Sequence, residues 1–208
     1  KAEEVICGNG AAEVIFTLCH AVKPKRALIP APTFAEYGQA LASTGCELEY
    51  YMLTENDGFV LSEAYLDILH KGLDMAFLCN PNNPTGMLIP HRLLKRILEK
   101  CRKLDILLVV DECFLDFVKE PEKYSLKRSL SGFNNLFILK AFTKRYAMAG
   151  VRLGYGLCSD RKLMERMELC VQPWNVSTMA QAAGLQALTE TEYVEEGRQL
   201  VFREAQWL

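Results

Sequence analysis

The chain has 208 residues, of which 50% are apolar, so it can bury the core of one domain or of one domain plus part of a second. Its 24 basic and 26 acidic side chains leave a formal net charge of −2. This balance argues against a protein held to nucleic acid or to an anionic membrane by its overall field. The longest apolar runs, such as residues 106–110, have strand length and fall far short of the roughly 20 residues that cross a bilayer.

Eight cysteines are spread along the chain without a CxxC pair, and the three histidines show no zinc-binding spacing. The sequence therefore predicts no metal site. Most of the cysteines sit inside apolar runs, where cysteine behaves as a small hydrophobic residue. Since no signal peptide is recognisable either, we expect a reduced, cytoplasmic protein.

Short apolar runs alternate with amphipathic stretches along the whole chain. The apolar runs are near-continuous blocks, as expected where helices cover both faces of a parallel sheet. The sequence therefore predicts an α/β fold in three layers, α/β/α, with a mostly parallel sheet. The predicted strands are residues 4–7, 26–30, 47–53, 75–79, 106–110, 136–139 and 154–158, and the clearest helices are residues 11–22, 35–43 and 91–104.

No repeat, low-complexity linker or internal boundary divides the chain, so residues 1–208 are predicted to belong to one domain. From about residue 189 onward the helical pattern becomes polar. We interpret this segment as a candidate connection to a second domain outside the chain.

Ligands of an open parallel sheet collect at the carboxyl ends of its strands. The first predicted strand is followed by Gly8-Asn9-Gly10, which leads into a helix whose free backbone N–H groups can bind an anion. The turn is not a dinucleotide fingerprint, because Glu13 stands where the third glycine is required, and it is not a Walker loop. A phosphate site and a tight packing turn both remain open interpretations of this segment.

Two further segments follow apolar strands. Residues 80–86 contain three asparagines, two prolines and a glycine, and this composition specifies a fixed backbone shape. We favour a loop that aims an asparagine amide at a ligand over a plain turn. Asp111 ends a run of aliphatic residues, where a carboxylate is costly to desolvate unless donors or a cation meet it. It is either bonded to nearby backbone or the counter-ion of a buried ligand cation.

Lys144 lies just past the apolar strand 136–139. A lysine is usually a solvated surface residue, but at the mouth of a parallel sheet it can lose its proton by desolvation and attack a carbonyl. Arg152 follows eight residues later among small and apolar residues, which favours a fixed partner such as a phosphate.

The helix predicted over residues 91–104 carries many basic side chains on one face. Glu99 and Asp105 interrupt this face and no aromatic residues are interleaved with it. We therefore interpret it as the solvated face of a crossover helix and not as a nucleic-acid site. Its basic members are Arg92, Lys95, Arg96, Lys100, Arg102 and Lys103.

A phosphate-binding turn, a shaped asparagine loop, a carboxylate at a strand end, a lysine and an arginine together match the requirements of pyridoxal phosphate. Its phosphate needs backbone N–H groups and a cation, and its pyridine nitrogen needs a carboxylate to stay protonated. Its aldehyde needs a lysine for a Schiff base. With these motifs in this order, the chain resembles, over essentially its whole length, the class I/II aminotransferases of pyridoxal-phosphate fold type I, and most closely their threonine-phosphate decarboxylase and histidinol-phosphate aminotransferase branches.

The resemblance implies a role for each matching residue. Lys144 is expected to form the Schiff base and to shuttle the α-proton, and Asp111 to pair with the pyridinium nitrogen. Asn83, in Asn-Pro-Thr-Gly, is expected to bond the ring hydroxyl, and Phe34, in Pro-Thr-Phe-Ala-Glu-Tyr, to stack on the ring. The phosphate is expected to bind the backbone of Gly10, Ala11 and Ala12, together with Thr143 and Arg152.

The sequence departs from the family pattern at two positions. Phe114 stands where aminotransferases usually carry a tyrosine that also bonds the ring hydroxyl, and Ala141 stands where many relatives have a phosphate-binding hydroxyl. The phenylalanine, the segment Pro173-Trp174-Asn175-Val176-Ser177 and the segment around Phe34 lean toward the threonine-phosphate decarboxylase branch.

The resemblance implies a pyridoxal-phosphate enzyme that acts at the α-carbon of an amino acid or amino phosphate by transamination of the histidinol-phosphate type. The first alternative is the decarboxylation of threonine phosphate in cobalamin biosynthesis, and the second is a non-catalytic ligand-binding domain of the same fold. A nicotinamide oxidoreductase is disfavoured because the third glycine is missing. In this family a small C-terminal domain carries the arginine that grips the substrate carboxylate, and the enzyme is usually a homodimer. We therefore expect residues 1–208 to be the large cofactor-binding domain, without that small domain and without the N-terminal segment.

Overall fold

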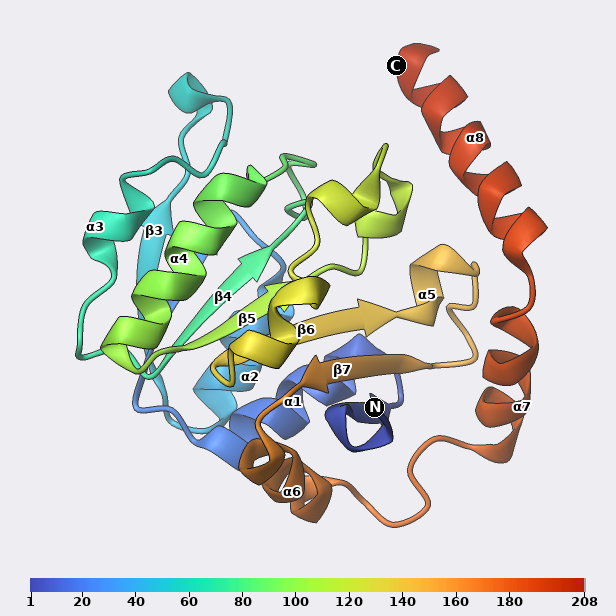
Figure 1. The fold of residues 1–208 in the computed structure, drawn as a ribbon, viewed down its shortest axis with the longest axis horizontal. Coiled ribbons are helices and arrows are strands. Elements are labelled where there is room, and N and C mark those ends of the chain that lie inside the picture. The colour runs from blue at the N-terminus through green and yellow to red at the C-terminus, as the bar shows by residue number, and fades with distance from the viewer. Residues whose placement is uncertain (208) are drawn as a thin grey trace.

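A computed structural model describes residues 1–207 of the chain, which form one seven-stranded sheet in the order β1-β7-β6-β5-β4-β2-β3 (Figure 1). Strands β2 to β6 run parallel to one another, and β7 is antiparallel to both β6 and β1. The strands are β1 (Val5–Gly8), β2 (Arg26–Ala31), β3 (Glu47–Met52), β4 (Met75–Cys79), β5 (Leu107–Asp111), β6 (Leu136–Ala141) and β7 (Gly154–Cys158).

Strand β7 is the one reversed member of the sheet, and its arrow points against that of β6 in Figure 1. Because β1 is antiparallel to β7 in turn, β1 runs in the same direction as β6. Six strands therefore end at one edge of the sheet, which is where an α/β fold collects its ligand-binding segments.

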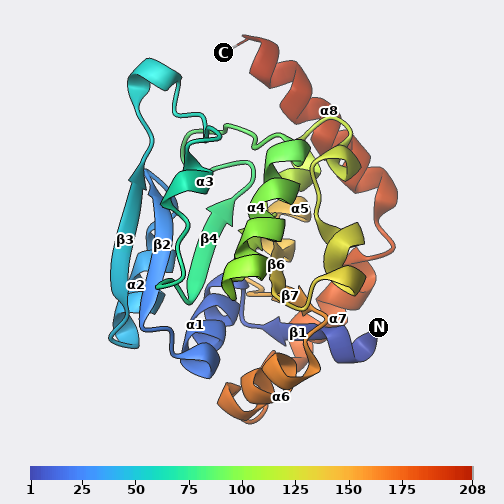
Figure 2. The same cartoon turned by 60° about the vertical axis from the view of Figure 1, so that its left-hand side comes forward.

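Helices cover both faces of the sheet, as the two views show (Figures 1 and 2). Helices α1, α2 and α6 pack on one face, and α3 and α4 pack on the other. This arrangement confirms the predicted three-layer α/β/α fold with a mostly parallel sheet. The helices are α1 (Ala11–Val22), α2 (Ala35–Ser43), α3 (Tyr65–Ile68), α4 (His91–Leu104), α5 (Phe142–Arg145), α6 (Arg161–Cys170), α7 (Thr178–Ala187) and α8 (Thr191–Trp207).

The central strands fill both cores because their side chains alternate between the two faces of the sheet. In β4, Phe77 packs with α1 and α2 while Leu78 packs with α3 and α4. The same alternation places Val109 of β5 in the first core and Val110 in the second. Asp111 has the parity of Val109, so its side chain belongs to the α2 side of the sheet.

The predicted elements are found with small changes at their ends. Strand β5 starts one residue later than predicted and includes Asp111, and β6 continues to Ala141, two residues beyond the predicted end. The helices α3, α5, α6 and α7 and five short 3-10 segments among residues 1–207 were not predicted; the longest of those segments is Lys127–Gly132. One 3-10 segment, Ala2–Glu4, precedes β1, and the other elements lie between strands or after β7, where the strand pattern gives no signal.

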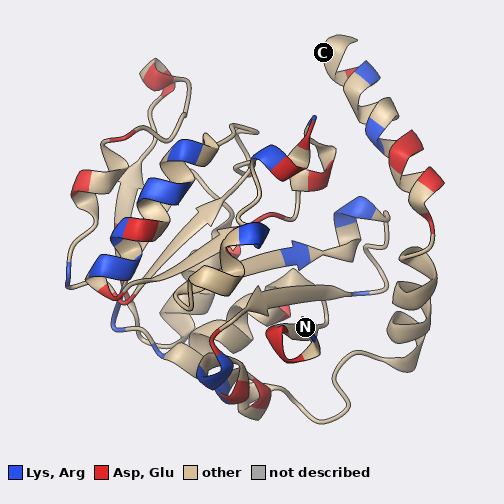
Figure 3. Cartoon of the chain, in the orientation of Figure 1, with Lys and Arg blue, Asp and Glu red and all other residues tan. Residues whose placement is uncertain are grey.

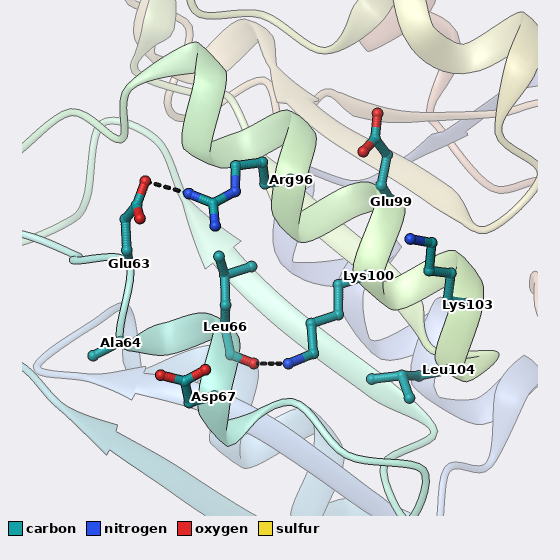
Figure 4. Close-up of a pocket in the computed structure, with 9 residues that line it drawn as sticks. All are labelled: Glu63, Ala64, Leu66, Asp67, Arg96, Glu99, Lys100, Lys103 and Leu104. Atoms are coloured by element: carbon teal, nitrogen blue, oxygen red, sulfur yellow. Dashed lines mark hydrogen bonds and ion pairs between the residues drawn. The ribbon is translucent and has the colours of Figure 1, made fainter.

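Basic residues lie along α4 (Figure 3), and most of them are exposed. Arg102 lies over the ring of Phe133, the one aromatic partner of this face in the described part of the chain. Between α3 and α4 lies an open hollow of about 700 Å³ (Figure 4). Arg96 pairs there with Glu63, and the Lys100 Nζ donates to the Leu66 carbonyl oxygen at 2.5 Å. These contacts join α4 to its neighbour, as expected for the outer face of a crossover helix.

Helix α8 extends past the body of the sheet, with the C-terminal end of the described chain at its far end (Figures 1 and 2). Its contacts are few, and it has no buried residue within Thr191–Trp207. Among residues 1–207, no helix combines the length and the apolar character that spanning a bilayer requires.

Gly156 tests the packing between β7 and the neighbouring strand. A Cβ at this position would overlap the ring of Phe137, which is fully buried and cannot move aside. We expect Gly156→Ala to lower the free energy of unfolding by about 1–3 kcal/mol, measured by urea denaturation. Gly132→Ala is the control, because a Cβ there meets open space, and an equal loss in both variants would contradict the packing assigned here.

Candidate functional site

A cavity of about 140 Å³ lies where segments from the carboxyl ends of the strands converge. Eight of the nine residues predicted to hold a cofactor line it, and they come from six separate segments of the chain. They are Ala11, Ala12, Phe34, Asn83, Asp111, Thr143, Lys144 and Arg152. The ninth, Gly10, is the residue that immediately precedes helix α1 and lies against Arg152.

The start of α1 forms one end of the cavity. Gly10 has a φ of 86°, and a Cβ on it would lie 2.6 Å from the Arg152 Nη2. Glycine is therefore required both by the backbone conformation and by the close approach of the guanidinium. Ala11 and Ala12 follow in the first helical turn, where backbone N–H groups have no partner within the helix.

Arg152 is exposed and forms no ion pair with any carboxylate among residues 1–207. Its hydrogen bonds are two long ones, at 3.4 Å, to the carbonyl oxygens of Ala149 and Asn9. A guanidinium held beside a helix N-terminus without a carboxylate partner provides both a cation and N–H donors for an anion.

The three asparagines of the loop after β4 have different tasks. Asn80 is buried and accepts a hydrogen bond from the backbone of Ile89 at 2.8 Å. Asn82 is buried and donates to the Pro32 carbonyl at 3.1 Å and to the Thr85 hydroxyl at 3.0 Å. These two residues hold the loop in shape, and Asn83, the residue after Asn82, lines the cavity.

Asp111 is 5% exposed and places a carboxylate at the floor of the cavity. Its Oδ1 accepts a hydrogen bond from the backbone N–H of Cys113 at 2.8 Å, and its Oδ2 accepts one from the Tyr37 hydroxyl at 2.6 Å. Donors to a carboxylate favour its ionised form, so they offset the cost of burying this charge.

Lys144 is exposed at the surface and its amine lies 5.2 Å from the centre of the Phe114 ring. It makes no ion pair within the described part of the chain, so no carboxylate competes with a ligand for its Nζ. Lys140 differs in this respect. Its ammonium lies 3.4 Å from Glu112 and 3.8 Å from Asp116, and it does not line the cavity.

A buried network holds the segments on both sides of Lys144. Glu112 is fully buried and accepts hydrogen bonds from the Ser125 hydroxyl and from the backbone of Leu126, both at 2.9 Å. Burial raises the pKa of the Glu112 carboxyl, although Lys140 and these donors oppose the rise. Asp116, the second partner of Lys140, also pairs with Arg145 at 2.6 Å. This ion pair fixes the position of Arg145, the residue that follows Lys144.

The cavity also contains residues for which no role was predicted from the sequence. Tyr37, Cys79 and Cys113 line it around Asp111, and the two departures from the family pattern, Phe114 and Ala141, line it as well. Tyr37 lies in the first turn of α2, three residues after Phe34, the residue that precedes this helix, and the two rings are in contact. This spacing was the available signal for Tyr37. No group of three His, Cys, Asp or Glu side chains suited to a metal ion occurs among residues 1–207.

Comparisons with known proteins agree with this geometry. The family model described as aminotransferase class I and II matches residues 1–208. The threonine-phosphate decarboxylase of Salmonella typhimurium is 43% identical over 92% of this chain, and the histidinol-phosphate aminotransferase of Anoxybacillus flavithermus is 31% identical over 93% of it. Each alignment covers 52% of the relative, so the chain spans about half the length of these curated proteins.

The fold has close counterparts among solved structures. The histidinol-phosphate aminotransferase from Clostridium acetobutylicum superposes with a TM-score of 0.89 and is 28% identical. The match covers 98% of this chain and 59% of that protein. Because the family model matches its full length, the chain belongs to the aminotransferase class I and II family.

Proposed function

We propose that residues 1–208 are the large, cofactor-binding domain of a pyridoxal-phosphate enzyme that acts at the α-carbon of an amino acid or amino phosphate. Enzymes of this family use pyridoxal phosphate. The observation that carries the proposal is that one cavity unites a free lysine amine, a carboxylate with two donors and an anion-binding helix start.

The residues present fit this cofactor. The space that a Cβ on Gly10 would fill is taken by the guanidinium of Arg152, which leaves a cationic cradle beside the N–H groups of Ala11 and Ala12. Such a cradle suits a phosphate. Asp111 is a buried carboxylate without an ion-pair partner among the described residues, and it suits a protonated ring nitrogen.

Each side chain then has a definite task. Lys144 would bind the cofactor aldehyde through Nζ. In transamination its amine would take the proton from the substrate α-carbon, and in decarboxylation it would supply a proton to that carbon after carbon dioxide has left. Asp111 would keep the ring nitrogen protonated, and Phe34 would cover one face of the ring. When bound, the cofactor supplies an electron sink that weakens the bonds at the α-carbon.

Asn83 and Phe114 would both lie near the ring hydroxyl of the cofactor, but only Asn83 could form a hydrogen bond with it. Asn83 has an amide that can bond to it, whereas Phe114 offers an aromatic ring without a hydroxyl. The Phe114 ring lies 5.2 Å from the Lys144 amine, so it packs beside the reacting nitrogen. Thr143 would add a hydroxyl to the phosphate end of the cavity.

The complete enzyme would contain more than these residues. Since the chain spans about half the length of its curated relatives, we place the group that grips the substrate carboxylate in a second, smaller domain. The exposed helix α8 would lead toward that domain. A homodimer is the proposed assembly, and a reduced, cytoplasmic setting suits its eight free cysteines.

Two reactions are open to such a site, because the bond that stands perpendicular to the cofactor ring is the one that breaks. We favour decarboxylation of threonine phosphate. The identity of 43% to a threonine-phosphate decarboxylase against 31% to a histidinol-phosphate aminotransferase supports this branch, and so does Phe114. Transamination of the histidinol-phosphate type is the second candidate, supported by the superposition on an enzyme of that name.

Product analysis of the complete protein separates the two reactions. Incubation with threonine phosphate is expected to release carbon dioxide and the corresponding amine in equal amounts. Incubation with histidinol phosphate and a keto acid is expected to leave both unchanged. Keto product from histidinol phosphate, without carbon dioxide from threonine phosphate, would establish the second candidate instead.

The anchor of the cofactor is tested by borohydride reduction in the presence of pyridoxal phosphate, followed by peptide mapping. We expect a single adduct on Lys144 and none in Lys144→Ala, whose apo form should keep its stability because the side chain is exposed. Lys140→Met is the control. It should keep the adduct but lose about 3 kcal/mol of stability, since Glu112 is left buried without its cation. An adduct on Lys140 or on scattered lysines would contradict the assignment.

The phosphate cradle is tested by Gly10→Ala. The new Cβ displaces the Arg152 guanidinium, and hydrogen bonds to charged groups are worth roughly 1.5–3 kcal/mol. The Kd for pyridoxal phosphate, measured by absorbance titration, is therefore expected to rise by about 10- to 100-fold. The Kd for pyridoxal, which lacks the phosphate, should change little. Equal weakening for both compounds would place the phosphate elsewhere.

A further inference from the structure

The hydroxyl of Tyr37 donates a hydrogen bond to the carboxylate of Asp111 on the floor of the cavity. Tyr37 is fully buried in α2, and its hydroxyl lies 2.6 Å from the Asp111 Oδ2. The other carboxylate oxygen is bonded to the backbone of Cys113 at 2.8 Å. Each oxygen has a second lone pair, so a further donor in the cavity can still bond to Asp111.

The direction of the Tyr37 hydrogen bond is fixed. Burial, and after it the charge of Asp111, raises the pKa of the Tyr37 hydroxyl well above its ordinary value of 10. The hydroxyl therefore stays protonated at physiological pH, and its proton points to the carboxylate. The nearby thiol of Cys79 stays neutral for the same reason, since burial raises its pKa to about 12.

The ring of Tyr37 is held rigidly by two other aromatic rings. It stacks on Phe77 of β4, with the ring centres 4.9 Å apart and an angle of 19° between the planes. It meets Phe34 edge-on, with the centres 5.5 Å apart at 75°. One side chain thus links Phe34, proposed to cover the ring of the cofactor, to Asp111, proposed to bond the ring nitrogen.

We propose that Tyr37 is a positioning residue that acts on the ring nitrogen of the cofactor through Asp111. The inference rests on the proposed function of the cavity. The hydroxyl orients the carboxylate, and its hydrogen bond stabilises the negative charge that would pair with a protonated ring nitrogen. Tyr37 would thereby influence how strongly the ring withdraws electrons.

The test compares Tyr37→Phe with the wild type, using the complete protein loaded with pyridoxal phosphate. This variant removes the hydroxyl and keeps the packed ring. The Kd for the cofactor is expected to rise about tenfold. The pH midpoint of the visible absorbance of the bound cofactor is expected to rise by about one unit. It rises because a less positive ring leaves the nitrogen bonded to Lys144 more basic.

Tyr65→Phe is the matched control. Tyr65 is also fully buried, but it lies in α3 on the opposite face of the sheet, and its hydroxyl has no hydrogen-bond partner in the described part of the chain. Its removal should leave both the Kd and the pH midpoint unchanged. A cofactor analogue with carbon in place of the ring nitrogen is the second control, because Tyr37→Phe should not weaken its binding.

Each outcome has a definite meaning. A wild-type protein without an adduct on Lys144 overturns the proposed function, and this inference with it. A wild type that binds through Lys144, combined with an unchanged midpoint in Tyr37→Phe, overturns the role of Tyr37 alone. An equal loss of affinity for the analogue also overturns it, since Tyr37 would then support only the shape of the cavity.

Discussion

The buried carboxylate of Asp111 is the feature on which the arrangement of the site depends. A charge at the end of a central strand must be met by donors, and it is met by Tyr37 from α2 and by the backbone that follows β5. Both donors are fixed by the packing of the first core, in which Tyr37 and Phe77 are fully buried. The stability of that core and the geometry of the cavity therefore have the same physical origin.

The alternation of side chains along the strands separates two sets of charges that are adjacent in the sequence. Asp111 faces the α2 side and the cavity, whereas Glu112 faces the opposite core and pairs with Lys140. The two lysines of this region are separated in the same way. Lys140 lies in β6 and forms ion pairs with Glu112 and Asp116. Lys144 lies four residues later, in α5, and its amine has no ion pair in the described part of the chain. The sheet thus leaves one carboxylate and one amine at the cavity.

Strand direction explains why segments far apart in the sequence meet at this cavity. Because β1 and β6 run in the same direction, the turn after β1 and the residues after β6 lie at one edge, although more than 130 residues separate them. Strand β7 is reversed, so it begins at the edge of the sheet where β6 ends. Arg152 lies just before β7 at this edge, and its guanidinium contacts Gly10. A single antiparallel strand brings the guanidinium to the start of α1.

Much of this arrangement could be predicted from the sequence, because Asp111, Lys144 and the asparagine loop directly follow recognisable apolar strands. The role of Tyr37 could not be predicted. Its hydrogen bond to Asp111 joins residues 74 positions apart and depends on how α2 packs against the sheet. Helices α6 and α7 also gave no clear signal. The pattern after β7 has few strongly apolar positions, and α7 exposes Met179 and Leu185. Local patterns identify the ends of strands, whereas contacts between elements require the packed structure.

A crystal structure of the complete protein with pyridoxal phosphate tests the central claim most directly. The account predicts electron density continuous with the Lys144 Nζ, a ring nitrogen within hydrogen-bonding distance of Asp111, and a phosphate against Ala11, Ala12 and Arg152. A cofactor bound outside this cavity, or bound in it with the ring nitrogen directed away from Asp111, would contradict the account.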